Sequence, residues 1–220
     1  MSNTMLSRVA DHLYWMGRYV ERTEHTARVL NVQSHLALEE SPANRSRRVA
    51  NVLSALRQPE LLVSSFEEAA TVLTLDPNNP SSVRANVRMA RENARQIRER
   101  IASEMWEQVN RLHLHVSDAE RAKTLLDQPH VFYNEVLIGT HLFNGLTDST
   151  MSHDQGWLFI QVGRWLERAG LLVSLLDTYL RVDAPNTYLD WLGLLKCCTA
   201  FEAYRKKIGS DLNAVSVVEF

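Results

Sequence analysis

The 220-residue chain has few of the residues that punctuate regular secondary structure, with 8 glycines and 6 prolines. A sandwich of many short strands needs more turn residues than this, so long helices are favoured. There are two cysteines, the neighbours Cys197 and Cys198, and backbone geometry opposes a bond between adjacent cysteines. No disulfide framework is predicted, and a reducing cytoplasm fits this composition.

Lysine is also scarce, and neither sign of charge dominates. The net charge is −2 and the pI about 6.4, whereas most nucleic-acid-binding domains are clearly basic, so nucleic acid is not expected as a partner. Most of the cations are arginines. That preference fits either the base composition of the genome or the recognition of anions, because a guanidinium grips carboxylate and phosphate groups in a planar fork.

Long uncharged apolar runs and familiar catalytic motifs are absent. The most apolar stretch, 157–176, is interrupted by Arg164, Glu167 and Arg168, whereas a membrane span needs about twenty largely uncharged residues. The N-terminus meets charged residues too early for a secretory leader. There is no Gly-rich phosphate loop, Cys-x-x-Cys, Gly-x-Ser-x-Gly or Glu-x-x-His pair. We expect a cytoplasmic protein without a membrane segment, metal or cofactor.

Apolar residues spaced by three and four predict helices along the whole chain, and no strand alternation occurs. The first helix is expected to run from Leu6 to about Leu38. The others are expected at 45–57, 61–75, 82–115, 131–146, 157–182 and 187–207 and from Leu212 onwards. Ser81 or Ser82 is the expected cap of the long helix 82–115, and 146–156 is expected to be a polar turn. We therefore predict an all-α helical bundle forming a single domain over 1–220.

One phrase occurs twice, as GRYVERT at 17–23 and GRWLERA at 163–169, 146 residues apart. Aligning 17–30 with 163–176 gives five identities in fourteen, and the 3-4 apolar seam transfers as well. This pattern predicts an internal duplication with a pseudo-twofold axis. The first repeat would cover about 1–116, and the second about 150–220, incomplete at its C-terminal end. Chance similarity between two amphipathic helices is the alternative.

The two phrase-bearing helices are expected to pack together at the centre of the bundle. The second is apolar on every side, which is typical of a buried helix. Charge inside a buried helix costs on the order of several kcal/mol per ion unless it is paired. Two interpretations stay open: a packing network of salt bridges, or an anion-binding site. The residues concerned are Arg18, Glu21, Arg22, Arg164, Glu167 and Arg168. Arg18 and Glu21, like Arg164 and Glu167, are three apart and are expected to share a face.

Two further groups are weaker candidates for a site. Arg88, Arg91 and Arg95 belong to an arginine stripe on the helix 82–115, which is either a solvated face or one wall of an anion cleft. His153 lies in the turn 146–156 and could serve as an acid if Glu21 or Glu167 served as a base. Asp154 in the same turn is most simply a helix cap.

The opening MLSRVADHLYWMGRYVERTEHTARVL resembles the alpha-E domain family of helical bacterial proteins, as do three further blocks, 75–110, 145–169 and 194–207. The resemblance covers essentially the whole chain. It implies an all-helical fold and gene neighbourhoods with a circularly permuted ATP-grasp ligase and a transglutaminase-like protein. Those two proteins are the partners it suggests. It carries over motif positions Arg18, Glu21 and Arg22 in the first block, and Arg91, Glu92, Asn93 and Arg95 in the second.

From this resemblance we expect an accessory protein of an ATP-grasp amide or peptide ligase that is not catalytic on its own. A stand-alone amide-processing enzyme using the Glu-Arg motif, and a purely structural scaffold, are the alternatives. Members of the family normally continue past VSVVEF with a second long helix. We therefore also expect uncovered apolar surface towards the C-terminal end, and a homo-oligomer or another assembly formed through it.

Overall fold

The computed structural model describes residues 5–37, 42–181 and 187–220, and in these residues it contains helices and turns but no strand. The prediction of an all-α protein is confirmed. The helices are α1 Ser7–Ala37, α2 Pro42–Ala55, α3 Phe66–Leu75, α4 Val83–Gln96, α5 Ser103–Ser117, α6 Ala119–Asp127, α7 Pro129–Thr150, α8 Gln155–Leu180, α9 Tyr188–Cys197, α10 Phe201–Lys207 and α11 Ala214–Glu219. The predicted ends of the first helix at Leu38 and of the helix 157–182 lie outside the described residues.

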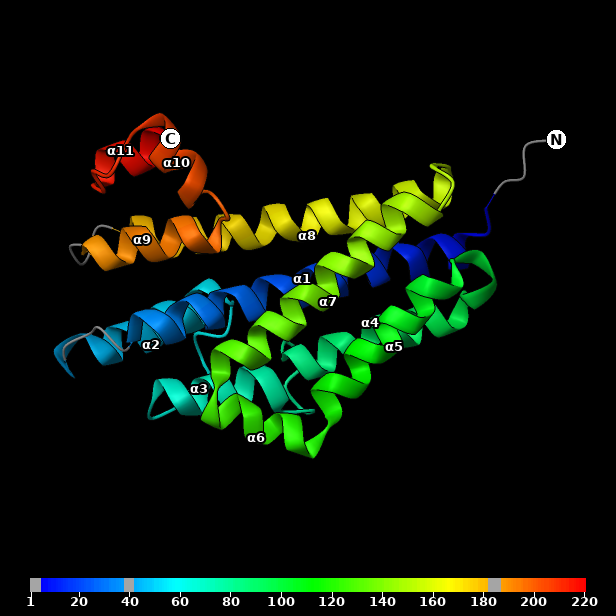
Figure 1. Ribbon diagram of the computed structural model, residues 1–220, viewed down its shortest axis with the longest axis horizontal. Coiled ribbons are helices and arrows are strands. Elements are labelled where there is room, and N and C mark those ends of the chain that lie inside the picture. The colour runs from blue at the N-terminus through cyan, green and yellow to red at the C-terminus, as the bar shows by residue number, and fades with distance from the viewer. Residues whose placement is uncertain (1–4, 38–41, 182–186) are drawn as a thin grey trace.

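Helix α1 is the centre of the bundle, with α8 along one side and α4 and α7 along the other (Figure 1). Helices α1 and α8 run parallel to each other, while α4 runs antiparallel to α1, with His12 bonded to Asn93 near one end and Val20 facing Val87 further along. The seam predicted for the first helix is buried along α1 from Leu13 to Leu30. A periodic apolar face therefore decides which side of α1 meets its neighbours.

The prediction of a single long helix over 82–115 is wrong, because this stretch forms two helices. The chain ends α4 at Gln96, makes a short 3-10 turn over Arg98–Arg100, and returns as α5, which packs against α4 as a helical hairpin. All seven seam residues are nevertheless buried: Val87, Ala90, Ala94, Ile97, Ile101, Met105 and Val109. Because the chain reverses between α4 and α5, both halves of the seam face the same core. No glycine or proline marks this reversal in the sequence.

Other boundaries move by a few residues for identifiable reasons. Helix α3 begins at Phe66 because the side chain of Ser65 accepts the backbone N–H of Glu68, and α8 begins after Asp154, which caps Gly156 as predicted. Ser82 caps α4. Helix α7 continues to Thr150, into the predicted polar turn, and α6 forms in a stretch for which no helix was predicted. The helix predicted over 187–207 is broken between Cys197 and Phe201, where Thr199 has a φ of 55°.

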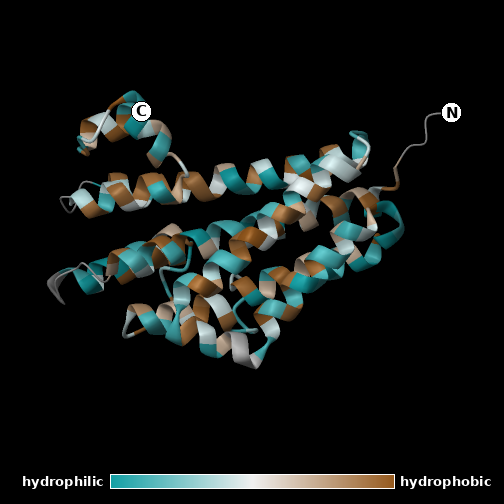
Figure 2. Cartoon of the chain, viewed as in Figure 1, coloured by the Kyte–Doolittle hydropathy of each residue, from teal (hydrophilic) through white to brown (hydrophobic). Residues whose placement is uncertain are grey.

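Helix α8 is not buried on every side, contrary to the sequence prediction. Apolar residues recur along the whole helix (Figure 2), but one face of it is covered and the opposite face is exposed. The covered face includes Ile160, Leu171 and Leu175. The exposed large apolar residues are Leu158, Phe159, Val162, Trp165, Leu166, Val173, Leu176 and Leu180.

The parallel helices α1 and α8 touch through two glycines, one from each copy of the repeated phrase. A Cβ atom at Gly17 would collide with the backbone carbonyl of Ile160, and one at Gly163 would collide with the backbone carbonyl of Tyr14. The two contacts are exchanged by the 146-residue offset, since Tyr14 corresponds to Ile160. Glycine is required at both positions because backbone, rather than a flexible side chain, occupies the space.

Replacing Gly17 or Gly163 by alanine should therefore push the two helices apart. We expect a destabilisation of about 1–3 kcal/mol, as in overpacked cores, and a melting temperature lower by about 3–8 °C. Gly145→Ala on α7 is the control, because a Cβ at Gly145 meets nothing within 4 Å. The control should be neutral or stabilising by up to about 1 kcal/mol. Equal effects at the three positions in thermal unfolding would contradict the close approach.

Candidate functional site

Four arginines and two glutamates of the repeated phrase form one network across α1 and α8. Glu167 accepts the Nε–H of Arg18 at 2.6 Å and that of Arg22 at 2.7 Å. Glu21 accepts two bonds from Arg168, at 2.5 and 3.0 Å, and lies 3.5 Å from the Nε of Arg164. The pairs thus cross between the helices and correspond under the 146-residue offset. The pairs that the i,i+3 spacing allows within each helix, Arg18 with Glu21 and Arg164 with Glu167, are replaced by pairs between the helices.

The carboxylates of this network are buried, and the arginine side chains are more exposed. The side chain of Glu167 is 2% exposed, whereas that of Arg168 is 41% exposed. Burial raises the pKa of Glu167, but the hydrogen bonds and charges of Arg22 and Arg18 more than offset this and hold the pKa below its ordinary value. Each buried carboxylate therefore holds arginine side chains that are themselves partly exposed.

Glu21 behaves differently from its counterpart. Burial raises the pKa of Glu21 above its ordinary value, and the neighbouring carboxylate of Glu24 adds to this, although Arg168 opposes it. Glu167 is held by two closely bonded guanidinium groups, whereas Glu21 has one closely bonded partner and one longer contact. Similar motifs therefore give two carboxylates with opposite shifts in proton affinity.

Aromatic side chains support the arginines of α1. The guanidinium of Arg18 lies 4.8 Å from the ring centroid of Trp15 and donates to the hydroxyl of Tyr14 at 3.1 Å. Arg22 lies 5.7 Å from the ring of Tyr19. Cation–π contacts of this kind hold a guanidinium in place. Tyr14 and Trp15 correspond to Ile160 and Gln161 in the second copy, so Arg164 lacks this support.

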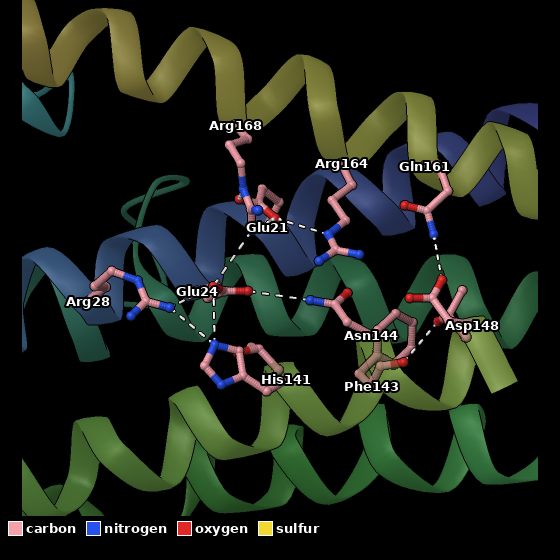
Figure 3. A network of polar contacts seen from close by, with 12 residues as sticks. Glu21, Glu24, Arg28, His141, Phe143, Asn144, Asp148, Gln161, Arg164 and Arg168 are labelled. Carbon is pink, nitrogen blue, oxygen red and sulfur yellow. Dashed lines mark hydrogen bonds and ion pairs between the residues drawn. The ribbon is translucent and has the colours of Figure 1, made fainter. Parts of the chain in front are cut away.

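The arginines of α8 instead face a second polar cluster, which sequence reasoning did not identify (Figure 3). At its centre Glu24 of α1 accepts a 2.7 Å bond from Arg28, and it lies 3.3 Å from His141 and 3.4 Å from Asn144, both on α7. Arg168 lies 3.7 Å from the same carboxylate. The i,i+4 spacing of Glu24 and Arg28 was a readable signal. No feature of the sequence indicated that α7 packs beside Glu24 and Arg28.

Arg164 is the least satisfied cation of the network. Its Nε is buried and makes no hydrogen bond to any of the described residues, and its contact with Glu21 is 3.5 Å long. Figure 3 shows its side chain pointing from α8 towards α7, near Asn144. A guanidinium with an unused donor can donate a hydrogen bond to a carboxylate or phosphate oxygen without giving up a short ion pair.

The remaining predicted site residues lie elsewhere. Arg88, Arg91 and Arg95 are on α4, where Arg91 bonds to Asn110 at 2.7 Å and Arg95 pairs with Glu92. His153 sits in the turn before α8, stacked on Trp157 at 4.3 Å. It precedes Arg164 by eleven residues, which is about three helical turns. The structure does not bring His153 to Glu21 or Glu167 as an acid–base pair.

The described residues contain neither a metal-binding cluster nor a membrane-spanning helix. In 5–37, 42–181 and 187–220, no group of three or more His, Cys, Asp or Glu side chains could hold a metal ion. Within the same ranges, no helix combines the length and the apolarity that crossing a bilayer requires.

The fold and this network define a class: an all-helical protein whose central parallel helices are joined by reciprocal Glu–Arg pairs. The chain belongs to the Alpha-E family, described as a predicted alpha-helical domain with a conserved ER motif, whose sequence model matches residues 5–220. Glu-Arg dipeptides at 21–22 and 167–168 stand at the centre of the network. The resemblance read from the sequence is confirmed.

Three similar proteins come from Mycobacterium bovis and from two strains of Mycobacterium tuberculosis, and all are named as uncharacterized proteins. Each is 26% identical over 238 residues, which is 96% of this chain and 27% of the relative. The chain thus spans about a quarter of the length of these curated relatives. No solved structure matches it.

Glu167→Gln should remove the shared partner of two arginines and destabilise the fold. We expect a loss of about 2–3 kcal/mol, because a buried charged network is broken, and a melting temperature lower by about 5–10 °C. Glu92→Gln is the matched control, since Glu92 and Arg95 form an exposed pair and such pairs contribute at most about 1 kcal/mol. Thermal unfolding of both variants measures the difference, and equal losses would argue against the buried network.

The opposite pKa shifts predict opposite pH dependences for two variants. The pKa of Glu167 is lowered in the folded state, so its stabilising charge is present above the unfolded pKa and lost as pH falls. The cost of Glu167→Gln should shrink below about pH 4.5. The pKa of Glu21 is raised, so its contribution is fully present below the unfolded pKa and is lost as pH rises. The cost of Glu21→Gln should shrink above about pH 4.5.

Unfolding of the two variants and the unmodified protein, followed in one series of buffers at constant ionic strength, tests this prediction. The difference in free energy of unfolding from the unmodified protein is the quantity compared. Parallel pH profiles for Glu21→Gln and Glu167→Gln would show that the two carboxylates have the same environment.

Proposed function

We propose that this chain is an accessory protein of an ATP-grasp-type amide or peptide ligase, and that it binds an anionic group beside Arg164. The single observation that carries the binding site is the buried, unbonded Nε of Arg164 within a network of otherwise closely paired arginines. The ligase association rests on the family's gene neighbourhoods. The absence of a phosphate-binding loop in the sequence supports a division of labour in which the partner uses the ATP.

The charge balance of the network supports anion binding. Five guanidinium groups surround three carboxylates between α1, α7 and α8, so the arginines exceed the glutamates by two. The cations are Arg18, Arg22, Arg28, Arg164 and Arg168, and the carboxylates are Glu21, Glu24 and Glu167. Because the carboxylates are buried, an approaching anion meets the guanidinium groups first.

Arg168 and Asn144 complete the proposed site. Arg168 is the most exposed arginine of the network, and Asn144 carries an amide that could turn towards an oxygen of the ligand. A carboxylate at the end of an acidic peptide, or an acyl-phosphate, has the charge and the planar or tetrahedral oxygens that these donors suit. The site would hold and orient the substrate, while bond formation takes place on the ligase.

A structural role is the second candidate, and a specific observation favours it. Glu167 holds Arg18 and Arg22 at 2.6 and 2.7 Å, and Arg18 is further held by Tyr14 and Trp15. We propose that this half of the network fixes the register of α1 against α8. The reciprocal glycine contacts and crossed ion pairs also support the internal duplication, with Arg164 and Arg168 as the half in which ligand binding became possible.

The site can be tested with inorganic phosphate as the probe. Raising phosphate at constant ionic strength should increase the melting temperature of the unmodified protein, because a ligand that binds only the folded state stabilises it. Arg164→Gln should abolish this increase. Arg181→Gln on the same helix is the control, because Arg181 pairs with Asp177 at 2.9 Å outside the network. An equal response in the unmodified protein and in Arg164→Gln would overturn the site.

The role can be tested by assaying ATP-dependent amide formation by the neighbouring ligase with and without this protein. We expect added protein to raise the rate, and Arg164→Gln to reduce that stimulation by about tenfold or more, because a charge-assisted bond to the substrate is lost. Arg181→Gln should stimulate fully. A ligase that is indifferent to the protein would refute the accessory role, whereas equal stimulation by Arg164→Gln would refute only the role of Arg164.

A further inference from the structure

A continuous apolar stripe runs along the outer face of α8. It consists of Phe159, Val162, Leu166, Ala169, Val173, Leu176 and Leu180, with Leu158 and Trp165 beside it. The first seven follow one another in alternating steps of three and four, which is the spacing of a coiled-coil seam. The large residues of this outer stripe are between 38% and 65% exposed. Helix α8 lies at the edge of the molecule (Figure 1), and these exposed side chains give it an apolar face towards solvent.

Helix α1 indicates what such a face does in this fold. Under the 146-residue offset, the outer stripe corresponds to the α1 residues Leu13, Met16, Val20, Thr23, Ala27 and Leu30. All six are buried, in contact with α4, α7 and neighbouring helices. The counterpart of the outer stripe is therefore core. No described helix covers the stripe on α8.

The outer stripe is large enough to form a stable interface. The exposed fractions of its eight large apolar residues add up to about four whole residues. At about 150–250 Å² each, this corresponds to roughly 600–1,000 Å². The largest apolar patch on a typical monomer is about 300–600 Å², and each partner of a standard protein–protein interface contributes about 800 Å². One copy of the stripe matches one side of such an interface.

The charge distribution allows a copy of the same chain as the occupant. The charged residues between 157 and 176 are Arg164, Glu167 and Arg168, and all three belong to the network facing α1. At the C-terminal end of the stripe, Asp177 and Arg181 neutralise each other at 2.9 Å. Two copies of the stripe can therefore meet without repulsion, and a twofold interface requires that one patch be complementary to itself.

We propose that the outer stripe of α8 is a homodimer interface, in which the stripes of two copies interlock about a twofold axis. The 3-4 spacing supplies side chains and gaps that recur at the same interval on both helices, so each seam fits the other. Trp165 supplies a large side chain of the kind that dominates binding energy at interfaces. This proposal is independent of the anion site, which lies on the side of α8 facing α1 and α7.

The test is the molecular mass of the intact chain in solution as a function of concentration. Sedimentation velocity, or size exclusion with light scattering, should give a dimer in the micromolar range. Val173→Glu and Trp165→Glu should each weaken the dimer at least about a hundredfold, because a charge is buried against apolar surface. Both side chains are exposed in the isolated chain, so circular dichroism of the variants should retain the helical signal.

Ile138→Glu is the matched control, since Ile138 on α7 is as exposed as Val173, at 65%, but lies outside the stripe. It should leave the dimer intact. A protein that is monomeric at every concentration overturns the proposal, whatever other helix the stripe binds. A dimer that survives Val173→Glu and Trp165→Glu, or one that Ile138→Glu dissociates to the same extent, overturns it as well.

Discussion

The structure depends on two carboxylates buried between parallel helices. An unpaired carboxylate in that position costs several kcal/mol, so Glu21 and Glu167 must each meet guanidinium groups. The partners come from the opposite helix, and this is possible because Gly17 and Gly163 let the two backbones touch. A shift of α1 along α8 would break the glycine contact and the ion pairs together. The register of α1 against α8 follows from this constraint.

The two halves of the network share a motif but have different surroundings. On the α1 side, the arginines contact aromatic rings of their own helix, and they hold the pKa of Glu167 below its ordinary value. On the α8 side, a second carboxylate, Glu24, competes for Arg168, and Arg164 keeps unused donors. One half of the network thus has its carboxylate paired closely with two arginines, and the other half, which we propose as the anion site, has a longer contact and an unbonded donor.

Helix α8 has one buried face and one exposed face, and both carry apolar residues. Its inner face contributes Glu167 and Arg168 to the network and is anchored to α1. Its outer face has the composition of core but no cover among the described residues. The corresponding faces of α1 are both covered, by α8 on one side and by α4 and α7 on the other. Helix α8 therefore exposes an apolar outer face, while ion pairs join its inner face to α1.

The sequence by itself determined the helical class, most helix positions, the family and the six residues of the central network, because periodicity and the repeated phrase depend only on local spacing. It could not determine that Arg18 pairs with Glu167 rather than with Glu21, since both partners lie within reach until two helices are docked. Nor could it reveal the hairpin between α4 and α5, whose seam is continuous in sequence, or the approach of His141 and Asn144 to Glu24. Which apolar face of α8 is covered was likewise decided only by tertiary packing. Both faces are apolar, so hydrophobicity alone does not distinguish the face that is buried from the one that stays exposed.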